Sequence, residues 1–479
     1  MAELLAMTTI TMPRTTISQT PSLLGQTVKL NGWVHRIRRM GDKLVFIDLR
    51  DESGFVQLVC YKPDLDEAIM QKVDELKPEY VISVEGVVNA RSEKQINPEM
   101  LTGKVEVAIK NVLILNRANT PPFPIDQDSI KVDEQLRLKY RYLDLRTERL
   151  QKNIRLRSAW VQACREFLFA QKFVEIETPL LTKATPEGSR DFVVPSRIQP
   201  GNFFALPQSP QQYKQLLMTA GFERYFQTAR ALRDEDPRAD RGFEHTQVDI
   251  EMSFVEREDV MQIVEAMVIQ SAEKLGFTLK EKPFPRISYR DAMQKYGADK
   301  FDLRTQEEKD AGVLAYAWVI DFPFFEMDVK TGHWTFTHNP FSQPLPEFRE
   351  DHLAGKNIGN ILTSQYDLVC NGYESGGGSI RAHEAEVLSA TYKIMGYSEE
   401  EIKGSVGHML EAFRFGAPPH GGIALGVERN LMNLTGETAL REVVAFPMTS
   451  SGNTSVMDAP SPLDAQTLQE LKISIKKSI

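Results

Sequence analysis

The sequence predicts an α+β protein in which a small N-terminal β-barrel precedes a larger domain of antiparallel strands and helices. Five short strand patterns follow one another between residues 26 and 115, and a proline-rich stretch comes after them. The second half alternates strand patterns with long helical patterns, without the regular spacing of parallel βαβ units. With 479 residues, the chain has room for two or three domains.

Composition narrows the class of protein. The net charge of −9 and the pI near 5.6 exclude a wholly basic nucleic-acid binder, but they allow a local basic footprint. Cys60, Cys164 and Cys370 are far apart and lack a paired histidine, so they indicate neither a disulfide framework nor a zinc site. The chain has neither the roughly 18 consecutive apolar residues of a membrane span nor the pattern of a signal peptide. We therefore expect a cytoplasmic protein without a membrane partner.

The first domain is predicted at residues 25–117, after a flexible segment at residues 1–24 that is rich in Thr, Ser and Pro. Its strand patterns are TVKLNGWV, KLVFIDLRD, GFVQLVCY, YVISVEGVV and KVEVAIKNVLIL, with a short helical segment from about Asp66 to Leu76. This count and order of elements predict an OB-type barrel.

A basic stretch, HRIRRMGDK at residues 35–43, is predicted to connect two strands of the barrel, and Phe46 follows it. Barrels of this type hold unpaired bases by phosphate contacts from Arg and Lys and by stacking on aromatic rings. The pattern favours an RNA-binding face. The alternative makes Phe46 a residue of the barrel core.

Residues 118–147 are predicted to be a linker or hinge, because RANTPPFPIDQD carries three prolines and no apolar period. The larger domain, at residues 148–479, is predicted to begin with an amphipathic helix from about Glu148 to Ala170. A strand follows from Phe173 and is ended by Pro179.

Further along, a helix is predicted from Asp259 to Leu275, and residues 280–317 are interpreted as a small connecting region. Strand patterns resume at AYAWVIDFPFFE, YDLVCNGYESGGGSIR and GGIALGVERNLMNL.

The stretch Phe226–Glu251 is predicted to be a long antiparallel hairpin whose return strand has one apolar face and one acidic face. Guanidinium groups match phosphate oxygens, so arginines among acids suit a nucleotide triphosphate held with metal ions. A solvated salt-bridge loop is the alternative. The charged residues of this loop are Arg230, Arg233, Asp234, Glu235, Asp236, Arg238, Asp240 and Arg241.

Three segments in chain order resemble the motifs of class II aminoacyl-tRNA synthetases. VEIETPLLTKATPEGSRDF resembles motif 1, FQTARALRDEDPRADRGFEHTQVDIE resembles motif 2, and GGIALGVERNLMNL resembles motif 3. RDEDPRADR, QSPQQYKQLLM and NGYESGGGSIR are similar to the bacterial type of aspartyl-tRNA synthetase, and the resemblance extends from about residue 25 to the C-terminus. It implies an OB-fold anticodon-binding domain followed by a class II antiparallel-sheet catalytic domain flanked by helices.

For L-aspartate, the resemblance implies that Lys214 and Arg381 recognise the side-chain carboxylate. An amide in its place would leave two buried charges unpaired, at a cost of several kcal/mol. Taken by itself, Lys214 also fits a surface lysine, and Gly376–Gly378 fit a tight bend. The other implied aspartate contacts are Glu187, Gln211, Arg233, Asp249 and His338.

For ATP, the resemblance implies that Arg233, Glu235 and Arg429 are catalytic, and that Asp367 and Glu374 hold Mg²⁺, which prefers oxygen ligands. The aspartate carboxylate would attack the α-phosphorus to give aspartyl-adenylate, followed by transfer to the 3′ end of tRNA. The implied ATP contacts are Arg233, Asp234, Glu235, His245, Glu374, Gly426, Val427, Glu428 and Arg429.

The implied macromolecular partner is tRNA-Asp, with tRNA-Asn left open, and pairing through motif 1 implies a homodimer. Two other functions stay open: an asparaginyl-tRNA synthetase, and a non-catalytic RNA-binding paralogue that uses only the barrel. The implied anticodon contacts are Arg38, Arg39, Phe46, Gln57 and Glu93.

The chain also departs from the family pattern. The large insertion usual between motifs 2 and 3 is missing or reduced to a stub at residues 280–317. Gly242 and Phe243 replace the usual Gln and Pro, and motif 3 reads GVERN instead of GLDRL. His245 stands where a phenylalanine usually stacks on adenine, and an imidazole offers less area for stacking.

Overall fold

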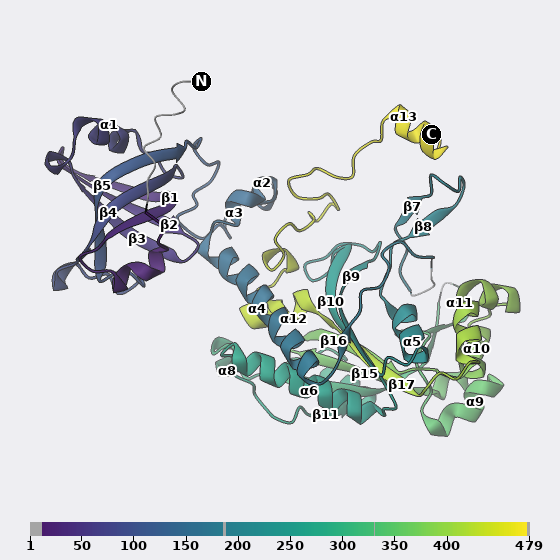
Figure 1. The fold of residues 1–479 in the computed structure, drawn as a ribbon. Helices are drawn as coiled ribbons and strands as arrows, with labels where there is room; N and C mark the ends of the chain where they lie inside the picture. Colours follow the sequence, from purple (N-terminus) through teal and green to yellow (C-terminus); the bar gives the residue numbers. More distant parts are fainter. Residues whose placement is uncertain (1–11, 185–187, 330, 477–479) are drawn as a thin grey trace. The chain divides into compact units, whose positions relative to one another are not determined.

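The computed structural model describes residues 12–184, 188–329 and 331–476 (Figure 1). The described residues form two compact units. The first runs to Arg137 and includes Tyr142–Thr147, whereas the second comprises Leu138–Arg141 and the chain from Glu148 onward. Among the described residues, no helix is both long and apolar enough to cross a membrane.

The first unit is a closed five-stranded barrel in the order β1-β2-β3-β5-β4, with one α-helix between β3 and β4. Alternate residues such as Val45, Ile47 and Leu49 fill its core. The predicted OB-type barrel is confirmed. Its elements are β1 (Thr27–Met40), β2 (Leu44–Asp51), β3 (Gly54–Tyr61), α1 (Glu67–Glu75), β4 (Val81–Ala90) and β5 (Val105–Asn116).

The basic stretch at residues 35–43 is mostly strand, so its predicted placement in a connection is wrong. β1 continues to Met40, which pairs with Leu44 of β2, and Gly41 makes the turn with a φ of 61°. Cross-strand hydrogen bonding to β2 extends the strand through a segment whose composition favours a loop. Arg36 and Arg38 therefore lie on one face of the strand and Arg39 lies on the other.

Part of the segment predicted to be flexible is ordered against the barrel. Ile17–Ser22 form a 3₁₀ helix, η2, in which Ile17 is fully buried and its backbone N–H donates to Asp51 Oδ2 at 3.0 Å. Residues 1–11 lie outside the described residues. After the barrel, the chain forms α2 (Glu134–Lys139) and α3 (Arg141–Asp144).

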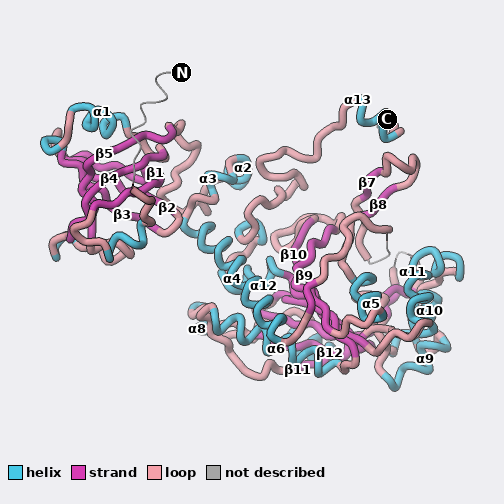
Figure 2. The backbone as a smooth tube through the Cα atoms, in the orientation of Figure 1, coloured by secondary structure: helices cyan, strands magenta, loops and turns pink. Residues whose placement is uncertain are grey.

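The second unit is built on a large sheet, drawn in magenta in Figure 2. The sheet has eight strands in the order β11-β12-β15-β16-β17-β10-β9-β6. The six inner strands pair antiparallel, and the short edge strands β6 and β11 pair parallel. The strands are β6 (Val174–Glu175), β9 (Arg224–Leu232), β10 (Glu244–Ser253), β11 (Arg286–Ser288), β12 (Tyr316–Pro323), β15 (Leu362–Cys370), β16 (Tyr373–Ile380) and β17 (His420–Gly426).

One face of this sheet packs against α4 (Glu148–Ala170) and α6 (Arg257–Lys274), with Trp160 and Met267 in the shared core. On β10, Val248 and Ile250 belong to that core, and the intervening acids point to the other face. The α+β fold class is confirmed, and the two-faced return strand follows from its alternation.

Residues 280–317 add to the sheet of the second unit. They form β11, α7 (Tyr289–Tyr296), α8 (Gln306–Asp310) and the start of β12, and Phe301 packs in a small core with Ala292 and Phe322. The remaining elements are β7 (Val193–Pro195), β8 (Phe203–Ala205), α5 (Gln211–Thr219), β13 (Phe325–Met327), β14 (Trp334–Phe336), α9 (Arg349–Ala354), α10 (Ala385–Ile394), α11 (Glu399–Phe413), α12 (Val427–Thr435) and α13 (Ala465–Leu471).

Candidate active site and nucleic-acid face

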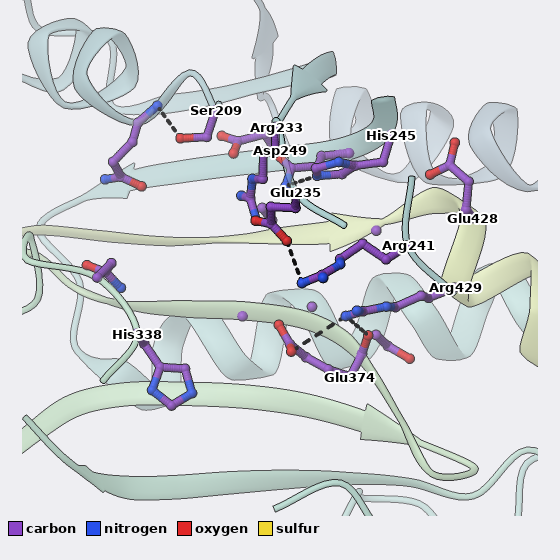
Figure 3. A pocket seen from close by; sticks show the side chains of 18 of the residues that line it. Ser209, Arg233, Glu235, Arg241, His245, Asp249, His338, Glu374, Glu428 and Arg429 are labelled. Atoms are coloured by element: carbon purple, nitrogen blue, oxygen red, sulfur yellow. Dashed lines mark hydrogen bonds and ion pairs between the residues drawn. The ribbon is translucent and has the colours of Figure 1, made fainter. Parts of the chain in front are cut away.

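A pocket of about 360 Å³ lies on the sheet face opposite the α4–α6 core (Figure 3). Side chains from β10, β15, β16, β17 and α5 line it, together with the loop between β9 and β10. Because the core takes one face of each strand, the polar residues of the alternate positions are left to line this pocket.

Two cations and two acids form a buried cluster at one end of the pocket. Lys214 Nζ lies 3.0 Å from Asp249 and 3.1 Å from Glu251 Oε2. Arg381 donates to Glu251 through Nε at 2.9 Å and through Nη2 at 3.2 Å. Lys214 is 1% exposed, so its interpretation as a surface lysine is wrong.

Burial raises the pKa of Asp249 to about 6, an effect that Lys214 partly offsets. Burial also acts to raise the pKa of Glu251, but the nearby Arg381 and Lys214 outweigh it and lower this pKa to about 2. Above pH 6 both acids are therefore ionised and balance the two cations.

Of the other residues implied for aspartate, Gln211 and His338 also line the pocket, and Glu187 lies outside the described residues. Gln211 donates to Gln215 Oε1 at 3.0 Å. His338 Nε2 lies 3.4 Å from Asp367 Oδ2. Burial acts to lower the pKa of His338, but the carboxylate of Asp367 outweighs this effect and raises it.

Arg233 and Glu235 lie at the mouth of the β9–β10 hairpin and line the pocket (Figure 3). Arg233 donates from Nε to the backbone oxygen of Gln208 at 3.2 Å. Glu235 pairs with Arg241 at 2.6 Å and accepts a hydrogen bond from Ser189 Oγ.

The alternative of a salt-bridge loop describes only part of this hairpin. Arg230 pairs with Glu244, and Asp234 pairs with Arg190 at 3.4 Å. Asp234 does not line the pocket, so its predicted contact with ATP lacks support. Arg233, by contrast, faces the pocket.

His245 lies in the pocket close to Arg233 and Arg429 (Figure 3). Burial, reinforced by these two arginines, lowers the pKa of His245 to about 3, so the imidazole is neutral at physiological pH. A neutral ring that is half-buried and lines the pocket is suited to stacking on a purine base. Its Nε2 lies 3.1 Å from Gln247 Nε2.

Gly242, the first departure from the family pattern, lines the pocket next to His245. Phe243 turns away from it, since its ring meets Phe192 edge-on at 5.3 Å between centroids. The second departure therefore contributes to packing of the hairpin.

The motif 3 residues divide between two roles. Arg429 lines the pocket, with Nη2 3.3 Å from Asp240 and Nη1 3.6 Å from Glu374 Oε2. Gly426 also lines the pocket. Val427 is 0% exposed and its side chain belongs to the α4–α6 core, so only its backbone could make the implied contact with ATP.

Glu428 lines the pocket and connects three elements. It accepts from Arg157 of α4 at 2.8 Å and from the backbone N–H of Thr246 at 3.0 Å. This carboxylate fixes α12 against β10.

Asp367 and Glu374 come from adjacent strands and converge over Gly377. A Cβ on Gly377 would lie 2.9 Å from Asp367 Oδ1 and 3.3 Å from Glu374 Oε1. Asp367 is 1% exposed, and its Oδ2 lies 3.4 Å from His338 Nε2. Two carboxylates whose oxygens converge on a space that a methyl group would fill fit a Mg²⁺ ion.

The three glycines of β16 do not form a tight bend, so that alternative is wrong. They lie within the strand, where a Cβ on Gly376 would meet Leu425 at 2.5 Å and one on Gly378 would meet the backbone of Gly422 at 2.1 Å. The close approach of β17 requires glycine there, because any side chain would push the strands apart.

On the barrel, Arg38, Phe46 and Gln57 lie together on the outer face. Phe46 is half-buried between the core residues Val45 and Ile47 and points away from that core, so its interpretation as a core residue is wrong. The Arg38 guanidinium lies 5.8 Å from the Phe46 ring centroid and donates to Gln57 Oε1 at 2.9 Å.

The structure does not bring Arg39 and Glu93 to this group. Arg39 binds Asp74 at the end of α1, and Glu93 is exposed on the 3₁₀ helix η4 (Glu93–Gln95). Glu106 of β5 stands in the group instead, because its Oε2 accepts from Gln57 Nε2 at 3.1 Å.

The structure brings three residues to these sites that the sequence did not assign to a site role: Asp240, named only as one charge of the hairpin loop, Glu106 and Lys300. Asp240 stands between Arg238 and Arg241, so its place in the charged loop was the sequence signal for a role in the site. Glu106 alternates with the core residues Val105 and Val107, which places it on the outer face. Lys300, which lies 2.9 Å from Glu374 Oε2, had no signal in the sequence.

Comparison with known proteins matches both parts of the chain to known families. The family of class II tRNA synthetases for D, K and N matches residues 133–450, and the OB-fold nucleic acid binding domain matches residues 28–115. An aspartate–tRNA ligase of Staphylococcus saprophyticus is 36% identical, over 95% of this chain and 98% of its own length.

The chain belongs to the aspartate–tRNA ligase family of class II synthetases. A second member of the family, the aspartate–tRNA(Asp/Asn) ligase of Syntrophomonas wolfei, is 39% identical over 95% of this chain and 98% of its own length. The alignment with the Staphylococcus member extends over 580 residues, against 479 in this chain, so that ligase carries residues without a counterpart here.

Solved structures show the class II fold without separating the family's substrates. Aspartyl-tRNA synthetase from Entamoeba histolytica has a TM-score of 0.72 and 23% identity, covering 92% of each chain. Asparaginyl-tRNA synthetase from Pyrococcus horikoshii, in complex with asparaginyl-adenylate, has a TM-score of 0.72 and 24% identity, covering 91% of this chain and 98% of that one.

Proposed function

We propose that this protein is an aspartate–tRNA ligase that activates L-aspartate with ATP and transfers it to the 3′ end of tRNA-Asp. The single observation that carries the proposal is the buried pair of cations, Lys214 and Arg381, at the end of the pocket. Asp249 and Glu251 balance these cations in the free pocket, and once the ligand's ammonium group pairs with Asp249, balance requires a side-chain carboxylate on the ligand, which asparagine lacks.

The acids of the cluster complete the recognition of aspartate. Asp249 lines the pocket with Gln211, and both offer oxygen acceptors to the amino group of the ligand. Glu251 is bonded on both sides by the two cations and holds them in place. The ligand's side-chain carboxylate would then receive hydrogen bonds from Lys214 and Arg381.

For ATP, the proposed contacts lie along the rest of the pocket. Arg233 would bridge the α-phosphate and the reacting carboxylate of aspartate, so that negative charge growing on the phosphate is met by a fixed cation. The neutral ring of His245 would stack on adenine, and Arg429 would lie along the phosphates. Positioning of the two reactants supplies the remainder of the rate enhancement.

Asp367 and Glu374 would hold Mg²⁺, which neutralises phosphate charge when it is bound. Support comes from the convergence of their oxygens over Gly377, on a space that a methyl group would fill.

On the barrel, the group formed by Arg38, Phe46, Gln57 and Glu106 would bind anticodon bases by stacking and hydrogen bonding. The half-buried ring of Phe46 and the bonded amide of Gln57 support this role.

We further propose a homodimer that forms through the edge of the catalytic sheet beside β6. Phe169, Val174, Leu180 and Leu181 are each about half exposed there, and such an apolar surface is typical of a subunit interface. Three buried free cysteines suit the reducing cytoplasm.

The test is aminoacylation of purified tRNA-Asp and tRNA-Asn with labelled aspartate, and with labelled asparagine as the matched control. Aspartate is expected on tRNA-Asp, and the tRNA-Asn arm measures whether that tRNA is also charged. Charging with asparagine would replace the proposal with an asparaginyl enzyme. Binding of tRNA without ATP–pyrophosphate exchange would leave only an RNA-binding paralogue.

A further inference from the structure

Lys300 reaches the metal-binding end of the pocket from a segment remote from the three motifs. It follows α7 in the loop at residues 297–301, and its Nζ lies 2.9 Å from Glu374 Oε2. Its side chain is 42% exposed, whereas that of Glu374 is 26% exposed. A cation therefore stands at the solvent side of a carboxylate that lines the pocket.

The two oxygens of Glu374 have different surroundings. Oε1 lies over Gly377 beside Asp367 Oδ1, where the cradle for a divalent ion is formed. Oε2 faces Lys300 at 2.9 Å and Arg429 at 3.6 Å. Because Lys300 and Arg429 hold Oε2, Oε1 is left pointing toward the space between Glu374 and Asp367.

The backbone ties the lysine and the carboxylate together. The N–H of Gly372, in the turn between β15 and β16, donates to the backbone oxygen of Phe301 at 3.0 Å. Phe301 is 5% exposed and stacks on Tyr296 with ring centroids 4.4 Å apart. Lys300 and Glu374 therefore extend from two segments that a hydrogen bond and a small core hold in fixed relation.

We propose that Lys300 is a positioning residue of the ATP site: it orients Glu374 so that Oε1 points toward Asp367 and is available to a divalent cation. The inference rests on the proposed function and adds a residue that acts through Glu374 on the metal. Residues that hydrogen-bond a metal-ligating carboxylate commonly change metal affinity by about 10- to 100-fold when they are replaced.

The experiment measures Mn²⁺ binding to the full chain in the presence of α,β-methylene-ATP, by the electron paramagnetic resonance signal of free Mn²⁺. Lys300→Met and Lys300→Gln remove the charge, and Lys300→Arg keeps it. Lys295→Met, at an exposed position on α7, is the matched control. Thermal unfolding of each variant is recorded alongside, with little change expected because Lys300 is partly exposed.

The two uncharged variants are expected to bind Mn²⁺ about tenfold or more weakly, with Lys300→Arg retaining most of the affinity and Lys295→Met all of it. Unchanged Mn²⁺ affinity in Lys300→Met would overturn the proposal. A rise in the KM for ATP without a change in Mn²⁺ affinity would also overturn it, because Lys300 would then bind a phosphate directly. Mn²⁺ binding needs neither aspartate nor tRNA, so this failure is distinguishable from failure to charge tRNA.

Discussion

The ammonium group of Lys214 lies 3.0 Å from the carboxylate of Asp249, and both side chains are 1% exposed. A charge pair removed from water in this way is tolerated only when its hydrogen bonds are made. Glu251 and Arg381 extend the pair into a balanced cluster of four charges. The cluster is therefore a point at which the fold is vulnerable, in addition to its proposed role in recognising aspartate.

Lys214→Met is expected to abolish measurable aspartate activation and to lower the free energy of unfolding by about 3 kcal/mol, because it leaves Asp249 partly uncompensated. ATP–pyrophosphate exchange and urea unfolding measure the two effects. The double variant Lys214→Met/Asp249→Asn is expected to regain part of the stability but none of the activity. Equal loss of stability in the single and double variants would contradict the coupling.

A pH effect is expected from His420, which is 0% exposed behind the cluster and faces Glu251, Arg381 and Gln215. Its Nδ1–H donates to the backbone oxygen of Pro418 at 2.7 Å, and its Nε2 lies 3.1 Å from Gln215 Nε2. These partners suit the neutral ring. Burial lowers its pKa to about 4, and Arg381 adds to this effect.

The folded chain therefore takes up this proton less readily than the unfolded chain. The contribution of the neutral His420 ring to the free energy of unfolding is complete above pH 6.5 and is lost as the pH falls toward 4. In urea unfolding between pH 5 and 7, His420→Gln should reduce the average slope of unfolding free energy against pH by about 1 kcal/mol per pH unit. His333→Gln, at an exposed position, is the control. Identical slopes for His420→Gln and the natural chain would contradict the contribution of His420 to the pH dependence of stability.

Phe46→Ala is expected to weaken aspartylation of tRNA while leaving ATP–pyrophosphate exchange almost intact. Loss of one stacked base costs about 1 to 3 kcal/mol, or roughly 5- to 150-fold in kcat/KM for tRNA. Leu115→Ala, at an exposed position of β5, provides a control on the same barrel. Equal losses in both assays would remove the anticodon role from Phe46.

The variants Glu106→Gln and Glu93→Gln test which acid contacts the anticodon. The structure favours Glu106, whereas the resemblance implied Glu93. Glu106 accepts from Gln57, whereas Glu93 is exposed on η4. The Glu106 variant should raise the KM for tRNA, and the Glu93 variant should leave it near that of the natural chain. The reverse order would restore Glu93 as the anticodon contact.

Gly377→Ala is expected to fill the cradle between Asp367 and Glu374, since the added methyl group would lie 2.9 Å from Asp367 Oδ1. Mn²⁺ binding with α,β-methylene-ATP should weaken about tenfold or more. Gly404→Ala, where a Cβ meets nothing within 4 Å, should leave binding unchanged. Full Mn²⁺ affinity in the Gly377 variant would show that the metal does not bind between Asp367 and Glu374.

Much of the fold was predictable because its signals are local. The helix predicted from about Glu148 to Ala170 has these bounds in the structure, and β10 shows the predicted alternation of core and acidic positions. Both patterns follow from the period of side-chain directions along a helix or strand. The strand from Phe173 was less accurate, since only Val174–Glu175 pair with a neighbour.

The candidate site was predicted less evenly. Lys214, Asp249 and Arg381 meet in the pocket, but the side chain of Val427 faces the core and Asp234 lies outside the pocket. A motif match names consecutive residues, whereas successive side chains at the start of a helix point in different directions. The resemblance therefore predicted the right segments and could not select the side chains within them.

By itself, the sequence determined the order of barrel and sheet domain, the hairpin at Phe226–Glu251 and the chemical types that surround the pocket. Only the tertiary structure decided that Lys300 reaches Glu374 and that Glu106 stands beside Gln57. These pairs join residues 74 and 49 positions apart along the chain. Such contacts depend on which strands are neighbours, and long-range pairing is fixed by the packing of the whole sheet rather than by local periodicity.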